Sequence, residues 1–241
     1  MDHRQHFYNQ YTTAQSRFQS IEDARTRVQI ETKGLERTVQ GALPTNRAAR
    51  VVDLGCGYGA FLLWMRERGY ENLRGIDLSQ EQVDLARQLG LDCVEVEDLF
   101  TALSQERDVD LITMFDVIEH LTRSEAISAL TTIAQVLSPG GTLILRTPNV
   151  DAALGTVLSY GDLTHELHLN KTSVLELFAT LEFHHVQVLP VPVVGGSFLA
   201  RLLRGILAPI AGITRTLRHI EQGISTNASI STPNMLIIAR R

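Results

Sequence analysis

The stretch Val51-Val52-Asp53-Leu54-Gly55-Cys56-Gly57-Tyr58-Gly59 predicts a buried strand that runs into a glycine-rich turn. A helix is expected directly after it, over about residues 60–69. Glycines permit positive φ angles and leave no Cβ between the backbone and a ligand that crosses the turn. Asp53 adds a carboxylate at the end of the strand. The stretch therefore indicates a small-molecule cofactor at the carboxyl edge of a parallel sheet.

The composition is that of a globular protein with one main domain and additions to it. The chain has 241 residues, of which 44% are hydrophobic and 20% charged, and its net charge is -5. Residues 190–241 contain six arginines and one acid, a local charge of +5, so the first 189 residues carry -10. An acidic body argues against a nucleic-acid partner. Cys56 and Cys93 lack the spacing of a disulfide framework or a zinc site.

No export signal or membrane span is expected. The first residues, Met1-Asp2-His3-Arg4-Gln5-His6, lack the pattern of a signal peptide. No apolar run approaches the roughly 18 residues of a transmembrane helix. We therefore expect a cytoplasmic protein.

Strands and helices alternate through the middle of the chain. Strands are expected over residues 72–78, 92–96, 110–115 and 142–146, with helices over 79–89 and 123–137 and a turn at 138–141. This alternation predicts an α/β fold with a parallel sheet. A helix over 171–181 and a closing antiparallel pair of strands, 183–189 and 234–239, are expected to follow. The chain is divided into an N-terminal helical cap (1–43), the core (44–190), a basic amphipathic helical insert (191–225) and the closing strand (226–241).

Acidic side chains end successive predicted strands. Asp53, Asp77 and Asp98 end three of them, and Asp116 follows the next. Because the carboxyl ends of parallel strands share one edge of the sheet, these carboxylates converge on one crevice. A dinucleotide would bring two phosphates into this negative crevice and be repelled, so an oxidoreductase is the weaker alternative. A ligand with an amine, a ribose and a cationic centre fits better.

These stretches resemble the ordered motifs of class I S-adenosylmethionine-dependent methyltransferases, over roughly residues 50–190: Val51–Gly59, Gly75–Ser79, Glu95–Phe100, Phe115–Leu121 and Ser138–Asn149. The resemblance implies a Rossmann-like sheet of seven strands, mostly parallel, with helices on both faces and one antiparallel strand. It implies S-adenosylmethionine as the cofactor. An N-terminal helical extension and a C-terminal helical insert would be additions to this core.

The resemblance also implies a role for each motif residue. Gly55, Gly57 and Gly59 would pass beneath the methionine part of the cofactor, with Asp53 beside them. Asp77, followed by Leu78, would bind the ribose hydroxyls. The remaining cofactor contacts would be Asp98 on the adenine amine, Leu99 through its backbone N–H, and Phe115 and Asp116 at the methionine end.

The acceptor is expected at the polar segment Tyr160-Gly161-Asp162-Leu163-Thr164-His165-Glu166-Leu167-His168, which precedes a helix. An imidazole can take a hydroxyl proton near neutral pH, so His165 is the expected general base and Asp162 would orient it. The alternative is that His165 only fixes the loop through a backbone hydrogen bond. His120 is expected to line the methyl-transfer site. The expected acceptor-binding side chains are Tyr8, Tyr11, Asn149, Tyr160 and Glu166, the two tyrosines as part of a lid. The alternative for the two tyrosines is a helix that packs their rings on the main domain.

This polar segment, with Thr147-Pro148-Asn149 before it, resembles methyltransferases of bacterial surface-glycan and sugar biosynthesis. The resemblance implies O-methylation of a sugar or glycan intermediate, including a lipid-linked one. A quinone-type or other lipid-like small molecule is the alternative acceptor. A cofactor-binding regulator without catalysis is the alternative outside enzymes.

No metal is the main expectation, with one alternative. Asp116, Glu119 and His120 would share a face if their segment were helical, and could then hold a divalent ion. The motif is similar to one in ubiquinone-pathway O-methyltransferases that bind magnesium, although its first member here is Asp rather than Glu. The pair His184-His185 is expected to be solvated.

The insert contains an amphipathic segment over residues 195–219. On a helical wheel its leucines and isoleucines gather on one side, opposite Arg201, Arg204, Arg215 and Arg218. Pro209 is expected to kink it into two shorter helices. Three interpretations stay open: the segment covers the core or the mouth of the site, it forms a homodimer interface, or it contacts an anionic membrane surface. In the third case the protein would lie at the inner face of the membrane.

Overall fold

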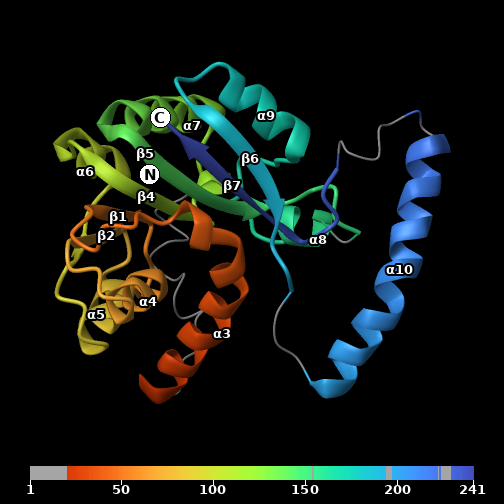
Figure 1. Ribbon diagram of the computed structural model, residues 1–241, viewed down its shortest axis with the longest axis horizontal. Coiled ribbons are helices and arrows are strands. Elements are labelled where there is room, and N and C mark those ends of the chain that lie inside the picture. Colours follow the sequence, from red (N-terminus) through yellow and green to blue (C-terminus); the bar gives the residue numbers. More distant parts are fainter. Residues whose placement is uncertain (1–20, 154, 194–196, 222, 224–228) are drawn as a thin grey trace.

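The computed structural model describes residues 21–153, 155–193, 197–221, 223 and 229–241. Seven strands form one sheet in the order β3-β2-β1-β4-β5-β7-β6 (Figure 1). The chain moves outward from β1 to β3, then returns to β4 on the other side of β1, so the order reverses between β1 and β4. Among the strands of the described residues, β7 alone runs antiparallel to the other six. The strands are β1 (Val51–Leu54), β2 (Leu73–Asp77), β3 (Val94–Val96), β4 (Val109–Phe115), β5 (Leu137–Pro148), β6 (His184–Pro190) and β7 (Asn234–Arg240).

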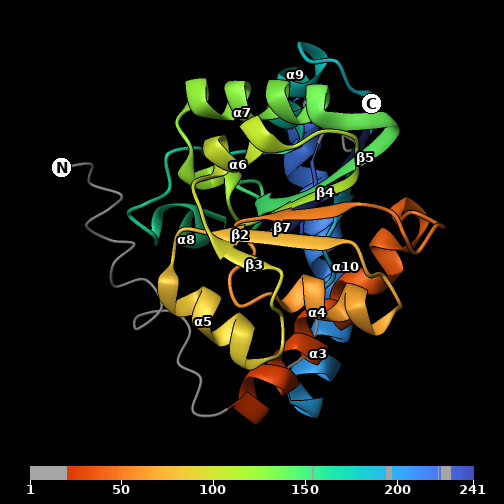
Figure 2. The ribbon, with the colours of Figure 1, turned by 90° about the vertical axis from the view of Figure 1, so that its left-hand side faces the viewer.

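Helices cover both faces of the sheet, as Figure 2 shows. Helices α4 and α5 lie on one face, α6 and α7 on the other, and α3 packs against α4. The expected mostly parallel, Rossmann-like fold is confirmed. The helices are α3 (Ile21–Val39), η1 (Gln40–Ala42), α4 (Ala60–Glu67), α5 (Gln80–Gln88), α6 (Leu99–Gln105), η2 (Ile118–His120), α7 (Arg123–Val136), α8 (Gly155–Tyr160), α9 (Lys171–Ala179) and α10 (Phe198–Glu221).

Apolar side chains fill the space on each face of the sheet. On one face, Leu130 and Ile133 of α7 join Leu143 of β5 in a buried cluster. On the other, Trp64 of α4 and Leu35 of α3 belong to a second cluster. The strands β1 and β4 are therefore buried on both sides, which matches their nearly continuous apolar sequence.

The turn expected at residues 138–141 lies inside β5 instead of before it. Leu137 pairs with Val109 and Thr142 with Leu111, so the four residues between them bulge out of the ladder. Gly140 has a φ of 78° there, a conformation that favours glycine. The bulge lets one long strand replace the expected turn and strand.

The insert between β6 and β7 contains one continuous helix, α10, rather than two shorter ones. Pro209 lies inside it. Proline supplies no N–H for the carbonyl four residues earlier, that of Gly205, but this glycine is exposed and water can bond its carbonyl instead. Among the described residues, no helix combines the length and the apolar character needed to cross a membrane.

Candidate functional site

The glycine turn after β1 uses its three glycines for different reasons. All three have positive φ angles, 68° at Gly55, 54° at Gly57 and 79° at Gly59. A Cβ at Gly55 would lie 2.3 Å from Val117, and a Cβ at Gly59 would lie 2.3 Å from Leu91. At Gly57 the nearest atom would be 3.8 Å away, in the side chain of Gln82. Gly55 and Gly59 are therefore required by packing, whereas Gly57 leaves open space.

A pocket opens beside this turn. It is lined by Asp53, Gly55 and Gly57 of the turn, by Phe115 at the end of β4, and by residues that the sequence did not indicate: Glu31, Thr32, Leu35, Tyr58, Gln82 and Arg146. Helix α3 supplies Glu31, whose carboxylate accepts a hydrogen bond of 2.8 Å from the Tyr58 hydroxyl. The N-terminal extension therefore forms one wall of the pocket. The predicted lid residues Tyr8 and Tyr11 lie outside the described residues.

Asp53 is a buried carboxylate in the pocket wall, with 2% of its surface exposed. Burial, with a smaller contribution from the nearby Asp77, raises its pKa from 3.8 to about 7. Thr113 donates a hydrogen bond of 2.6 Å to it, which works in the opposite direction. A cation in the pocket would favour the ionised form of this group.

Asp77 and Asp98 end β2 and follow β3, as predicted, and both carboxylates bind backbone N–H groups. Asp77 accepts from Gly57 and from Ser79, each at 2.8 Å. It therefore ties the glycine turn to the neighbouring strand, and burial raises its pKa. Asp98 caps α6 by accepting from Phe100 and Thr101. Beside these two carboxylates, Leu78 is 54% exposed and Leu99 is buried.

Asp116 and Phe115 both contact Arg146 of β5. The Arg146 Nε lies 3.0 and 3.1 Å from the two Asp116 carboxylate oxygens, and its guanidinium stands 5.4 Å from the centre of the Phe115 ring. Asp116 has a φ of 55°. Burial lowers the pKa of Arg146, but Asp116, together with Glu31 and Glu119, more than offsets this, so the pKa is raised. A charged pair therefore stands at the wall of the pocket, where the sequence indicated only the acid.

The residues of this pocket fit S-adenosylmethionine. Gly57 leaves space where any other residue would add a Cβ, and the buried Asp53 and the acidic Glu31 favour a ligand with positive charge. When bound, this cofactor supplies a methyl group on a positively charged sulfur.

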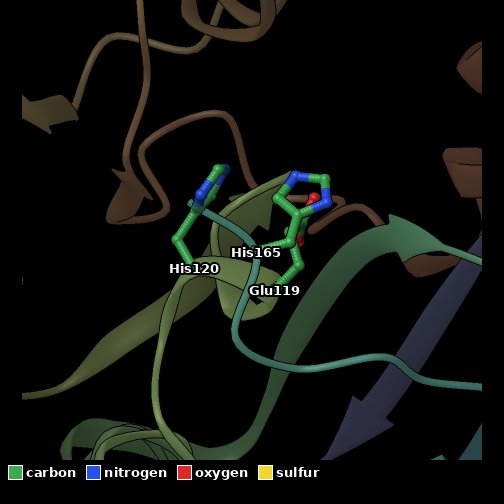
Figure 3. A group of neighbouring side chains, drawn as sticks. All are labelled: Glu119, His120 and His165. Atoms are coloured by element: carbon green, nitrogen blue, oxygen red, sulfur yellow. The ribbon is translucent and has the colours of Figure 1, made fainter. Parts of the chain in front are cut away.

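A second group of polar side chains lies at the carboxyl edge, next to the strand β4. Glu119, His120 and His165 bring one ligand atom each to within 4.8 Å of one another (Figure 3). Glu119 and His120 belong to η2, whereas His165 comes from the loop after α8. Glu166 and Leu167 donate backbone hydrogen bonds of 2.7 and 2.9 Å to the Glu119 carbonyl, which joins this loop to η2.

The alternative metal set, Asp116, Glu119 and His120, is not the one that the fold assembles. Asp116 lies before η2, and its carboxylate turns toward Arg146. Glu119 and His120 are joined by His165 instead. The three residues Asp116, Glu119 and His120 do not share a helical face because only residues 118–120 form a helical turn.

Hydrogen bonds assign the proton on each histidine. The His165 Nδ1 lies 3.1 Å from the Ser159 carbonyl, which can only accept, so Nδ1 carries the hydrogen and Nε2 is the basic nitrogen. Thr164 donates its hydroxyl hydrogen to Asp162 at 2.6 Å, so it accepts from the His120 Nδ1 at 2.8 Å. The two imidazole rings meet edge to face, with their centres 4.7 Å apart.

The Asp162 carboxylate lies too far from the His165 imidazole for the direct hydrogen bond that its predicted orienting role would require. Its closest hydrogen bonds go to Thr164, and its second oxygen stands 4.0 Å from the His165 Nε2. Burial, together with the neighbouring His165, lowers the pKa of His120. Burial and the nearby Asp116 raise the pKa of Glu119 well above its usual range. Both shifts favour the neutral forms of His120 and Glu119 in this cluster.

The predicted acceptor residues differ in their exposure. Tyr160 is 63% exposed and stacks on His168, and Glu166 is also exposed. Asn149 is fully buried, and its amide donates to the carbonyls of Ile230 and Thr232. Its predicted acceptor contact is wrong, because these bonds use the side chain to hold the chain before β7. His184 and His185 are exposed, as expected.

The family follows from a comparison with known proteins. Residues 25–190 match the family described as a methyltransferase domain. The chain belongs to this family. Methyltransferase domains of this class use S-adenosylmethionine, in agreement with the pocket described above.

Curated relatives of this methyltransferase domain have different named activities. The chain is 30% identical over 112 residues to a ubiquinone biosynthesis O-methyltransferase of Neisseria meningitidis, with 43% of the chain and 45% of the relative covered. It is 32% identical over 110 residues to an indolepyruvate C-methyltransferase of Streptomyces griseus, with 42% and 33% covered. The chain thus spans less than half the length of these relatives.

Solved structures share the fold of the methyltransferase domain. An S-adenosylmethionine-dependent methyltransferase from Archaeoglobus fulgidus has a TM-score of 0.64 and 18% identity, with 87% of this chain and 94% of that one covered. A phosphoethanolamine N-methyltransferase 2 of Haemonchus contortus, solved with S-adenosylmethionine, has a TM-score of 0.61 and 15% identity, with 97% and 60% covered.

Proposed function

We propose that this protein is an S-adenosylmethionine-dependent O-methyltransferase whose acceptor is a hydroxyl of a sugar or glycan intermediate. The single observation that carries the proposal is the partly buried His165–Asp162 pair at the carboxyl edge of the sheet, in which the Nε2 of His165 is the basic nitrogen. A hydroxyl acceptor needs a proton acceptor as its oxygen forms the new bond, whereas much of the remaining catalysis is alignment.

His165 takes the hydroxyl proton at Nε2 while its Nδ1–H stays bonded to the Ser159 carbonyl. The Asp162 carboxylate, 4.0 Å from Nε2, stabilises the imidazolium that forms. His120, held by Thr164, packs against the His165 ring and limits its rotation. The exposed Tyr160 and Glu166 of the same loop offer aromatic and polar contacts to the acceptor.

A second mechanism is favoured by one observation, the approach of Glu119, His120 and His165 ligand atoms to within 4.8 Å. One carboxylate and two imidazoles are a set that binds divalent transition metals. An ion there would lower the pKa of the acceptor hydroxyl directly, and His165 would then be a ligand rather than a base.

A quinone-type or other lipid-like hydroxyl is the second candidate acceptor. Similarity to a relative named for ubiquinone biosynthesis supports it. The polar character of the Tyr160–His168 loop favours the sugar instead, because it offers hydrogen bonds rather than an apolar wall.

Two experiments test the proposal. Titration calorimetry with S-adenosylmethionine and with NADH should give binding only to the first. Methyl transfer from labelled cofactor to a panel of nucleotide sugars, lipid-linked glycans and demethylated quinols then identifies the acceptor class.

The same transfer assay separates the metal mechanism from the base. Loss of transfer after EDTA, restored by a divalent ion, would support the metal mechanism. EDTA-resistant transfer that His165→Gln abolishes would support the base.

A further inference from the structure

Helix α10 has one apolar face that the described fold leaves uncovered. Figure 1 shows the helix standing apart from the sheet and its other helices. Ten large apolar side chains on it are between 46% and 74% exposed: Phe198, Leu199, Leu202, Leu203, Ile206, Leu207, Ile210, Ile213, Leu217 and Ile220. At 100° per residue they occupy one half of the helix surface. A continuous exposed face of this length marks an interaction site.

The opposite half of the helix carries its positive charge. The positions of Arg201, Arg204, Arg215 and Arg218 lie about opposite the centre of the apolar face. No aspartate or glutamate occurs between Glu182 and Glu221. The first 189 residues, in contrast, carry a net charge of -10. The molecule is therefore electrically asymmetric, with a net positive charge on the uncovered helix and a net negative charge on the rest of the fold.

The insert leaves and rejoins the fold at the edge that carries the candidate site. Pro190 at the end of β6 pairs with Met235 near the start of β7. Asn149, directly after β5, bonds to the Pro233 carbonyl. Both attachments therefore lie at the carboxyl edge of the sheet, where Asp116 and the His165 loop also lie.

We propose that α10 docks flat on an anionic lipid bilayer, with its apolar face in the boundary between headgroups and acyl chains and its arginines near the lipid phosphates. Charge favours this occupant. An anionic surface attracts the helix and repels the acidic body, so the molecule would bind through α10 alone. A second copy could cover the apolar face, but the arginine positions would then lie on the outer side of the pair, so a self-contact would make no use of the positive charge of the helix.

This step rests on the proposed function. If α10 docks on a bilayer, the docking also indicates the class of the acceptor. Because the insert is attached at the candidate-site edge, docking holds the His165 loop close to the bilayer. The acceptor hydroxyl would then belong to a lipid-linked molecule at the membrane surface.

Vesicle flotation tests the docking, using full-length protein with vesicles of phosphatidylcholine alone or mixed with phosphatidylglycerol. Binding is expected only with phosphatidylglycerol and should weaken as salt rises. Ile206→Glu should abolish it. Arg201→Gln and Arg204→Gln should each weaken it roughly fivefold. The matched control is Ile127→Glu, which changes a 47% exposed isoleucine on α7 and should leave binding unchanged.

The failures of the two proposals are distinguishable. Wild-type protein that binds S-adenosylmethionine but does not float with phosphatidylglycerol would overturn the docking alone. Protein that floats but binds no S-adenosylmethionine would support the docking and overturn the proposed function. A dimer in light scattering that Ile206→Glu dissociates, without lipid binding, would overturn the docking and identify the face as a self-interface.

Discussion

Replacing Asp53 with asparagine should stabilise the protein and weaken cofactor binding. Asp53 is 2% exposed, and burial raises its pKa from 3.8 to about 7. The folded protein therefore holds a proton on this group between those two pH values, where the unfolded chain has already released it. The contribution of Asp53 to the free energy of unfolding therefore falls as the pH rises through this window, and it stays constant above it. The difference between the two pKa values corresponds to up to about 4 kcal/mol.

The asparagine keeps the shape of the side chain and an oxygen that can accept the Thr113 hydroxyl hydrogen. At pH 8, without cofactor, Asp53→Asn should therefore be more stable than wild type. At pH 4 the two proteins should be nearly equal. Urea denaturation at both values measures the free energies of unfolding, and comparing the two proteins at each pH removes the contribution of other groups such as Glu119.

Cofactor binding provides a second measurement of opposite sign. S-adenosylmethionine brings positive charge to the pocket, so loss of the Asp53 carboxylate should raise its dissociation constant at pH 8. A variant no more stable than wild type at pH 8, or one that binds the cofactor as tightly, would refute the assignment of a buried, ionisable pocket carboxylate.

Three further substitutions divide the site by role. Asp77→Ala should weaken S-adenosylmethionine binding by roughly tenfold or more in calorimetry, since it removes a charged hydrogen-bond acceptor; unchanged affinity would exclude the predicted ribose contact. Gly57→Ala adds a Cβ at a φ of 54°, which costs about 1–2 kcal/mol; the midpoint of thermal unfolding should fall by roughly 2–8 °C, and an unchanged midpoint would contradict the strain. His165→Ala should leave cofactor affinity unchanged but slow methyl transfer by roughly 10²–10⁴-fold; equal losses of affinity in His165→Ala and Asp77→Ala would show that the division of roles is wrong.

The sheet could be predicted because its signals are local. Three apolar residues in the four positions before the glycine turn indicate a buried strand, and the Ser79 cap begins α5 where it was expected. The bulge in β5 could not be predicted, because a proline and two glycines normally indicate a turn. Whether such a segment stays in the ladder depends on the partner strand β4.

The candidate site was predicted in part. Asp53, Gly55, Gly57 and Phe115 could be assigned to the pocket that the structure shows, because motif spacing along one edge of a parallel sheet is readable from order alone. Arg146 and Glu31 were missed because no local pattern indicates that either side chain reaches the pocket, each from another element, β5 or α3. Asn149 was assigned to the acceptor because a polar residue after a strand resembles a site residue, but burial gives it a role in the fold.

The amino-acid sequence alone determined which segments become strands, which turn needs glycine and which residues could meet at one edge, since these depend on neighbours a few positions apart. Tertiary structure decided which of them meet. Asp116 turns to Arg146, thirty positions away, and His165 joins Glu119 and His120 across a gap of more than forty. Such contacts depend on the register and packing of whole elements, and no local pattern encodes them.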